Sequence, residues 1–537
     1  MGEWKRSNSR RWDESVEYTS IMIYWQNQWK SWIIVERNGG FSMESIKKVV
    51  GLLMLGVSCS FLPLANAEIK TYEGKGEYIM SDFETPDIAK QRAKVRAEQH
   101  AAEQAGVFVS SYTKTVNSVI ADDEITVIAN TIIKVTDEKY TISPINENGG
   151  GLRVQVVLKA TVDSDKIDNW LKREYKKNME LVEQNKILRE EREKQDKEIQ
   201  ELRQKISVTT DSQGKKSLEK ILIKEDKKFL SLQKVDEGNK LFDDGKYRES
   251  IDKYSQAIGL NEYSALAYNG RGNAYSSIGD VQQAIVDYNK AIEINPNFDM
   301  AYTNRGGLYG KYGYTQQAIS DCNKAIEINP QNKGAFNNRG LVYTGLEKYE
   351  QAIFDYNRAI SIDNNYETAY LNRGLTYARQ GKYQEAIDDY SRAIEINSLS
   401  AEAYMNRGLV YVELRNYQQA ASDYEKALII DPDDYKSYYN RGNLYRIKGD
   451  YQRAISDFSK AISINDRYSI AYNNRGITYA MLGDYKKASE DFSVAISINP
   501  HDAMAYYNRG LIYNRLGNIA LANRDFSMAK SLGYNVK

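Results

Sequence analysis

The chain has 537 residues, more than one hydrophobic core accommodates, so we expect several domains. Its 73 basic and 73 acidic residues give a formal net charge of zero, which provides no global electrostatic argument for nucleic-acid binding. With two cysteines and two histidines, a disulfide framework, a histidine-based metal site or a Ser-His triad is not expected. The 42 tyrosines and only 7 prolines favour a helical repeat with aromatic packing positions.

A long apolar stretch covers residues 49–64, preceded by two lysines and followed by the tripeptide Ala-Asn-Ala, which ends at Ala67. A basic flank, a short apolar run and a small-x-small motif are typical of a secretory signal peptide. The run is shorter than the roughly 20 residues of a membrane span. We therefore predict a signal peptide at residues 43–67, cleaved after Ala67, and an exported protein of the periplasm or cell envelope.

This signal begins late in the chain. Met43 stands just ahead of the two lysines, so we interpret it as the start and residues 1–42 as a miscalled N-terminal extension. The alternative is a genuine cytoplasmic tail on a signal anchor. Residues 56–59 also resemble a lipoprotein box ending at Cys59, but its usual Leu is absent and apolar sequence follows, so we prefer cleavage at Ala67.

Residues 68–165 predict a small α+β domain. Strand patterns cover residues 71–80, 107–116 and 152–162, a helix is predicted over 87–105, and three glycines at 149–151 predict a turn. The segment that begins at Gly74, with its Ala-rich helix, resembles a domain of small bacterial envelope lipoproteins and of the flagellar-assembly protein T. That resemblance implies an envelope protein and assigns no site residues.

Residues 166–206 are rich in charge and predict a helical, coiled-coil stalk, followed by a polar linker over 207–230. One side of its heptad seam carries Leu171, Asn178, Asn185, Arg192, Ile199 and Ile206, and the other carries Glu174, Leu181, Leu188, Gln195 and Leu202. The two seam asparagines would specify the register of a homodimer. A solvated helical spacer is the alternative, and both interpretations stay open.

A 34-residue period governs residues 231–536. Nine repeats begin at residues 231, 265, 299, 333, 367, 401, 435, 469 and 503. All nine carry Gly at position 8 and Ala at position 27, and eight carry Tyr at position 11. The period and these anchors resemble the tetratricopeptide repeat. The resemblance implies an all-α, right-handed superhelix of helical hairpins, in which each hairpin covers the apolar face of its neighbour.

Two charged positions of the repeat vary together. Position 7 is Arg and position 23 is Asp in eight repeats, whereas the first repeat reverses both signs with Glu237 and Lys253. We therefore predict that the two side chains form an ion pair that joins the helices of each hairpin. The predicted pairs are Arg271–Asp287, Arg305–Asp321, Arg339–Asp355, Arg373–Asp389, Arg407–Asp423, Arg441–Asp457, Arg475–Asp491 and Arg509–Asp525.

Position 6 is Asn in seven consecutive repeats: Asn304, Asn338, Asn372, Asn406, Asn440, Asn474 and Asn508. In the tetratricopeptide family this position lies on the first helix of each hairpin, which lines the concave surface. The row is similar to that of the O-linked N-acetylglucosamine transferase superhelix, which binds extended polypeptide. An amide offers a donor and an acceptor to a peptide backbone. The alternative is that these asparagines bond only to neighbouring helices.

Side chains near this row predict a mildly apolar groove, formed by Leu341, Leu375, Leu409, Ile477 and Leu511 with Tyr439 and Tyr507. Cys322 takes position 24, where the other repeats carry Tyr or Phe, and is expected to be buried as a small apolar side chain.

The resemblance implies a scaffold for protein–protein interaction. We expect an extended segment of a protein or peptide partner to bind on the concave face; the alternative is a structural envelope protein that associates with itself. Residues 68–165 carry no phosphate-binding loop, nucleophile elbow or metal-ligand spacing, so we expect no enzyme activity, catalytic residue, metal or other cofactor. Nucleic acid is not an expected partner, and contact with a membrane is expected only through export or envelope association.

Overall fold

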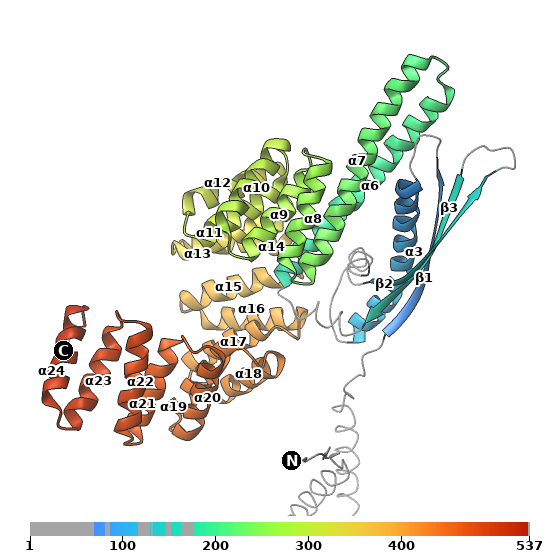
Figure 1. Cartoon of the computed structure of the whole chain (residues 1–537). Helices are drawn as coiled ribbons and strands as arrows, with labels where there is room; N and C mark the ends of the chain where they lie inside the picture. Colours follow the sequence, from blue (N-terminus) through green and yellow to red (C-terminus); the bar gives the residue numbers. More distant parts are fainter. Residues whose placement is uncertain are drawn as a thin grey trace, which may run out of the picture. The chain divides into compact units, whose positions relative to one another are not determined.

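The computed structural model describes residues 69–80, 86–115, 129, 133–145, 152–163 and 175–534 (Figure 1). The expected N-terminal extension, the signal peptide and the glycine turn at 149–151 lie outside these residues. Within the described ranges, no helix combines the length and the apolar character that a membrane crossing requires.

The first described part is a three-stranded antiparallel sheet. Its strands β1 (Ile69–Met80), β2 (Lys134–Pro144) and β3 (Leu152–Asp163) lie in the order β1-β3-β2. Side chains alternate along β3, so that Val154, Val156, Leu158, Ala160 and Val162 are buried on one face. The strands predicted over 71–80 and 152–162 are thus present.

Helix α3 (Pro86–Thr115) packs on the buried face of the sheet. It lies so close to β1 that a Cβ atom at Gly76 would stand 1.9 Å from the carbonyl oxygen of Ala93. Phe108 and Val109, both buried, belong to the core that α3 forms with the sheet. The strand predicted over 107–116 is therefore wrong, because its apolar residues prolong the helix.

Residues predicted as a stalk and a linker form a helical hairpin instead. Helix α6 (Tyr175–Val208) packs against α7 (Ser212–Asp243), whose N-terminus is capped by the Asp211 carboxylate. Two seam residues of α6, Ile199 and Ile206, are buried in one cluster with Leu222 and Phe229 of α7. The linker prediction is wrong, since α7 covers most of it, and the seam proposed for a dimer has a partner within its own chain.

A buried ion pair joins α3 to α7. The Nη2 atom of Arg92 lies 2.6 Å from Oδ1 of Asp226, and the two side chains are only 3% and 5% exposed. Arg92 also donates a hydrogen bond from Nη1 to the hydroxyl of Tyr78 on β1, at 2.7 Å. Removing one partner of such a pair would leave a buried charge without compensation, so this contact holds helix and sheet to α7.

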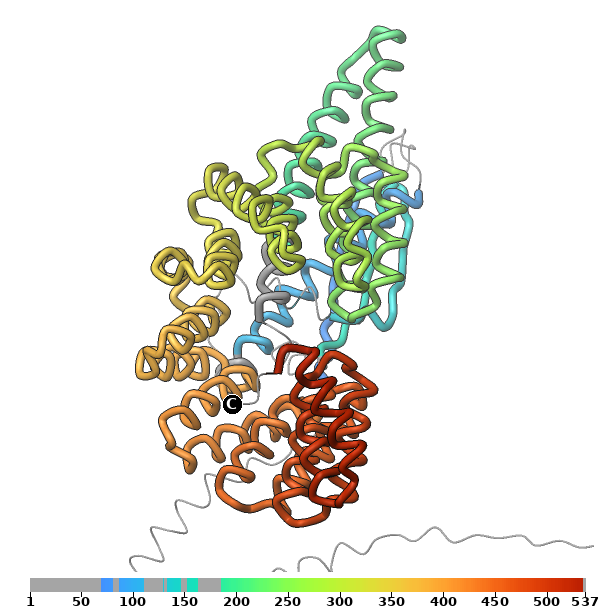
Figure 2. Tube along the Cα trace, turned by 90° about the vertical axis from the view of Figure 1, so that its left-hand side faces the viewer, coloured from blue at the N-terminus to red at the C-terminus, as the bar shows by residue number. Residues whose placement is uncertain are grey.

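Nine helical hairpins follow in chain order, the first built from the C-terminal part of α7 and from α8 (Figures 1 and 2). Within each hairpin the two helices pack together, and the second helix packs on the first helix of the next hairpin. The helices are α8 (Tyr247–Leu260), α9 (Ala265–Ser277), α10 (Val281–Ile294), α11 (Asp299–Lys311), α12 (Thr315–Ile328), α13 (Lys333–Gly345), α14 (Tyr349–Ile362), α15 (Glu367–Arg379), α16 (Tyr383–Ile396), α17 (Ala401–Glu413), α18 (Tyr417–Ile430), α19 (Tyr435–Ile447), α20 (Tyr451–Ile464), α21 (Ser469–Met481), α22 (Tyr485–Ile498), α23 (Ala503–Arg515) and α24 (Ile519–Ser531).

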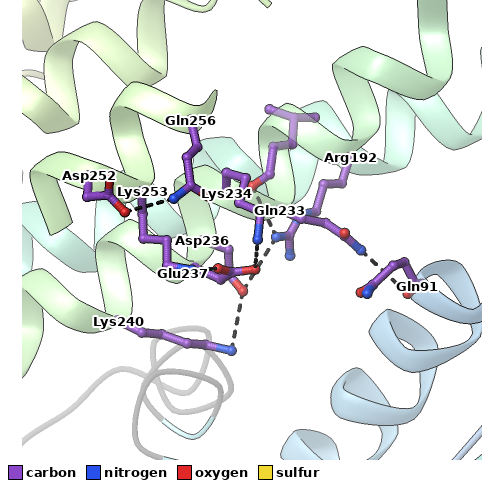
Figure 3. Close-up of polar contacts among 11 residues, drawn as sticks. Gln91, Arg192, Gln233, Lys234, Asp236, Glu237, Lys240, Asp252, Lys253 and Gln256 are labelled. Atoms are coloured by element: carbon purple, nitrogen blue, oxygen red, sulfur yellow. Dashed lines mark hydrogen bonds and ion pairs between the residues drawn. The ribbon is translucent and has the colours of Figure 1, made fainter. Parts of the chain in front are cut away.

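Each predicted Arg–Asp pair is present and bidentate. In the fifth repeat, Arg373 donates from Nε and Nη2 to the two carboxylate oxygens of Asp389 at 2.8 and 2.6 Å. The same pair of bonds forms in the other seven repeats that carry these residues. In the first repeat the reversed pair, Lys253 with Glu237, closes at 2.7 Å (Figure 3).

The same arginines also reach the preceding hairpin, which the sequence did not predict. Nη1 of Arg373 donates to Oδ1 of Asn357, and Nη1 of Arg407 donates to Oγ of Ser391 at 2.9 Å. In both cases the acceptor lies on the second helix of the repeat before. The guanidinium of Arg373 further lies 5.4 Å from the ring centroid of Tyr370, a cation–π contact that recurs along the array.

The fourth repeat illustrates the charge state of these pairs. Burial raises the pKa of the Asp355 carboxyl, whereas the hydrogen bonds to that carboxylate raise the pKa of Arg339. A raised pKa favours the neutral form of Asp355 but the charged form of Arg339, so the two shifts favour different charge states of the pair. The arginine decides the outcome, because a guanidinium keeps its proton at any accessible pH and two parallel bonds to it require an ionised carboxylate.

Glu367 is a buried carboxyl at the start of α15, only 3% exposed. Asn397, in the loop after α16, donates from Nδ2 to Oε2 of Glu367 at 3.0 Å. No cation pairs with this carboxyl among the described residues, and burial raises its pKa to about 7. Ionisation at neutral pH therefore weakens the packing at the start of α15, where the loop after α16 covers Glu367.

We expect the Arg–Asp pair to be architectural. The single substitutions Arg373→Glu and Asp389→Arg should each cost about 3 kcal/mol, because each leaves a half-buried charge facing its own sign. The double exchange should recover about 1 kcal/mol or more of the summed loss, as the reversed pair of the first repeat indicates. Chemical unfolding of the four proteins measures this coupling, and strictly additive losses would show that the two side chains do not interact.

We also expect Glu367 to make stability depend on pH. Its pKa rises from an ordinary 4.5 to about 7 on folding, so the folded chain holds a proton that the unfolded chain has lost between these values. The free energy of unfolding therefore falls by on the order of 3 kcal/mol as the pH rises from 4.5 through 7. Glu367→Gln should be more stable than the parent at pH 8 and nearly equal at pH 4.5.

Thermal melts between pH 4.5 and 8 provide the measurement for Glu367→Gln. Glu413→Gln, which replaces an exposed carboxylate on α17, is the matched control. If Glu367→Gln and the control retain the same pH dependence as the parent, Glu367 is not the group that titrates.

Candidate functional site

The seven predicted asparagines lie at the same place on seven successive first helices, α11, α13, α15, α17, α19, α21 and α23. Asn338 is buried and the other six are partly buried. They occupy the helix turn that carries the paired arginine, one residue before it. The packing that fixes each Arg–Asp pair therefore also fixes the direction of each asparagine.

Five of these asparagines donate hydrogen bonds to the repeat before them. Nδ2 of Asn304 donates to Oδ1 of Asn269 at 3.2 Å and to Oδ1 of Asn273 at 3.1 Å. Asn372, Asn474 and Asn508 make the corresponding bonds to Asn337, Tyr439, Asn443 and Asn473, and Asn338 donates to the carbonyl of Thr303. The interpretation that these residues bond to neighbouring helices thus accounts for at least one N–H donor of each of the five.

Asn406 and Asn440 differ from the other five. Neither side chain forms a hydrogen bond with any residue in the described parts of the chain, and both are partly exposed. Their amides are free to donate and to accept. In the rest of the row the carbonyl oxygens of Asn304, Asn372, Asn474 and Asn508 have no donor among the described residues, and Asn372 and Asn508 each use one of their two N–H groups. A bound backbone would therefore meet two complete amides in the middle of the array.

A pocket of about 560 Å³ opens on this face of the array between α9, α11 and α13. Asn304 and Asn338 contribute to its lining, so two of the predicted asparagines reach it. Its apolar wall includes Phe242, Leu308 and Leu341. Most of the lining comes from positions 6, 9, 12 and 13 of successive first helices, and the rest includes Tyr288 and Thr315 on second helices.

The predicted apolar neighbours divide into two groups. Leu341, Leu409 and Leu511, all at position 9, are 43%, 39% and 43% exposed on this face. Leu375 and Ile477 are partly buried. Tyr439 is committed to packing, because its hydroxyl accepts from Asn474 and its ring lies 5.3 Å from that of Tyr468. Cys322 is fully buried beneath Gly306.

Helix α6 covers the beginning of the same face. Asn185 of α6 accepts a hydrogen bond at 2.6 Å from Nδ2 of Asn239, which has position 9 in the first repeat. Arg192 of α6 lies 3.5 Å from Asp236, which takes position 6 there (Figure 3). The N-terminal part of α6 thus lies in the groove of the first repeat, and α6 also contacts α15.

The fold is that of a solenoid of helical hairpins, and sequence comparison assigns its family. Models of the tetratricopeptide repeat match residues 238–279, 265–298, 301–332, 343–381, 371–435, 435–468 and 469–502. This part of the chain is therefore an array of tetratricopeptide repeats, a fold that generally mediates protein–protein interaction. No curated protein matches the chain.

Three solved structures illustrate the likeness of the array to known proteins. The APC/C hetero-tetramer Cut9-Hcn1 matches with 18% identity over 57% of this chain and 60% of that chain, at a TM-score of 0.43. A tetratricopeptide repeat protein from Parabacteroides merdae shares 26% identity over 44% of this chain and 94% of its own, at 0.37. YrrB, described as a TPR protein with an unusual peptide-binding site, shares 26% over 35% and 97%, at 0.28.

Proposed function

We propose that this chain is an exported, non-enzymatic scaffold that binds an extended polypeptide segment on the first-helix face of its repeat array. The observation that carries this proposal is the pair Asn406 and Asn440, whose amides form no hydrogen bond within the described chain. Two complete amides 34 residues apart present the donor and the acceptor that a peptide backbone requires. They lie in the row whose earlier members, Asn304 and Asn338, reach the pocket.

The distribution of exposed apolar side chains supports an extended ligand over a folded one. The exposed leucines at position 9 offer separate apolar contacts rather than one continuous apolar patch. Backbone contacts through amides bind without selecting side chains, and the isolated leucines add contacts for individual side chains. The start of the face is held by α6, so the proposed path for the segment runs from the pocket toward the C-terminal repeats.

The double substitution Asn406→Ala/Asn440→Ala tests the binding site without breaking a bond between repeats. A randomised dodecapeptide library displayed on phage is selected against the purified chain, and the enriched peptides are synthesised and titrated. Because two hydrogen bonds of about 1 kcal/mol each are lost, the dissociation constant should rise about tenfold or more. Thermal stability should hardly change.

Gln418→Ala/Gln452→Ala is the matched control, because both residues are exposed amides on the second helices of the same two repeats. These changes should leave affinity intact. Equal affinity of the parent and Asn406→Ala/Asn440→Ala would remove these residues from the binding site. If no peptide is enriched and the arrays associate with one another in solution, the structural alternative is the better account.

Export is inferred from the apolar segment and the Ala-Asn-Ala motif alone. The chain isolated from its native cell is expected to begin at Glu68, which N-terminal sequencing measures. Leu55→Arg, which places a charge in the apolar run, should leave the chain unprocessed because a charged h-region no longer inserts. A native chain that retains Met1 or Met43 would contradict cleavage after Ala67.

A further inference from the structure

The third repeat has smaller residues at three positions than the repeats on either side of it. Position 9 is Gly307, whereas Leu341, Leu375 and Leu409 hold it in the next three repeats. Position 12 is Gly310, and position 24 is Cys322 in place of an aromatic residue. No other repeat of the array carries Gly at position 9, Gly at position 12 or Cys at position 24. The pocket between α9, α11 and α13 opens at this hairpin.

Both glycines form part of the pocket lining. A Cβ atom at Gly307 would lie 2.8 Å from Nδ2 of Asn338, and one at Gly310 would lie 3.0 Å from a methyl carbon of Val342. Any side chain at these positions would enter the space that is now open. The walls are Phe242, Leu308, Leu341 and Leu346, so the floor is backbone and most of the surround is apolar.

We propose that this pocket is the anchor subsite of the array and takes one large aliphatic or aromatic side chain of the bound segment, with an acidic residue beside it. The inference rests on the proposed function and names the chemistry of its ligand. The chain itself indicates which side chain fits, because the next three repeats fill the equivalent position with leucine. A segment that supplies such a side chain replaces the contacts that Gly307 lacks.

A positive charge at the rim of the pocket accounts for the acidic residue that we propose beside the anchor. Lys311 lines the pocket at the C-terminal end of α11, and its side chain is exposed. The pocket lining contains no aspartate or glutamate, and no carboxylate among the described residues forms an ion pair with Lys311. A ligand carboxylate next to the anchor would complement this charge. Asn304, whose carbonyl oxygen is unengaged, accepts a hydrogen bond from the ligand backbone.

The anchor side chain gains its affinity from removal of apolar surface from water. Full burial of a leucine-sized side chain raises affinity by about ten- to a hundredfold, which is enough to dominate the binding of a short segment. The glycine-floored pocket exists before binding, so no side chain of the array has to move aside. Binding of this kind favours a few hot-spot contacts over a long series of weak ones.

The probes are the dodecapeptides selected against the parent chain, synthesised with and without alanine in place of each large apolar residue. One apolar position of the peptide should be essential, with its alanine form binding at least tenfold more weakly. Gly307→Leu fills the pocket and should abolish that difference, because the parent peptide and its alanine form then bind equally weakly. Lys311→Glu should remove the preference for an acidic neighbour.

Gly307→Leu displaces the Asn338 amide, and impaired folding would weaken peptide binding as a filled pocket does. A second variant therefore separates these two causes. Leu341→Asp places a charge on the pocket wall at a side chain that is already 43% exposed, and should weaken binding at least tenfold. Leu409→Asp, at the same position two repeats further on and 39% exposed, should have a much smaller effect. Thermal melts of all variants establish that they fold.

The outcomes separate this inference from the proposed function. Peptides that bind without an essential large apolar residue, or that bind Gly307→Leu and Leu341→Asp as tightly as the parent, overturn the anchor and leave peptide binding standing. Failure of the parent chain to enrich any peptide overturns both. A dimer in solution that Leu341→Asp dissociates would make a second copy of this chain the occupant, and would also overturn the proposal.

Discussion

The architecture of the array depends on one arginine in each hairpin from the second to the ninth. Each of these residues holds the second helix of its own repeat through two bonds to an aspartate, and most reach the second helix of the preceding repeat through Nη1. A single side chain thereby connects three helices. Since each hairpin leaves an apolar face that only its neighbour covers, a contact that spans two hairpins fixes how they stack.

The bidentate pairing with arginine explains why the array tolerates so many buried aspartates. Their side chains are 1–9% exposed, which would be costly if the carboxylates were unpaired. The guanidinium is planar and presents its donors in a fixed fork, so it can satisfy a carboxylate and a third acceptor together. The aromatic rings beside it, such as Tyr370, also shield it from water and account for part of the high tyrosine content.

The periodic part of the fold was predictable because nine copies of one pattern reveal which positions vary together. The joint sign reversal at Glu237 and Lys253 predicts a contact between the two side chains, and the structure contains it. No such comparison was available for residues that occur once. The apolar residues at 107–116 fit a strand as well as the end of a helix, and only their packing on the sheet decides for the helix.

The same limit applies to contacts between distant segments. Arg92 and Asp226 are 134 residues apart and belong to different elements, so nothing in the sequence connects them. The heptad pattern of α6 correctly indicated a buried seam, but a pattern cannot tell whether its partner is a second chain or the following helix. A linker of only three residues after α6 makes the intrachain partner available at a far higher effective concentration.

For the candidate site, the sequence identified the row of asparagines but could not tell its members apart. Apart from Asn338, which donates to a backbone carbonyl, each amide of the row is engaged only where position 5 or 9 of the repeat before it supplies a side-chain acceptor. Asn372 meets an amide oxygen of Asn337, whereas Asn406 follows Leu371 and Asn440 follows Met405, which offer no side-chain acceptor. Apolar residues at position 5 therefore leave the next asparagine available for a ligand. In a repeat protein, identity between repeats maintains the stack, and the proposed binding site draws on departures from that identity, namely Leu371, Met405 and Gly307.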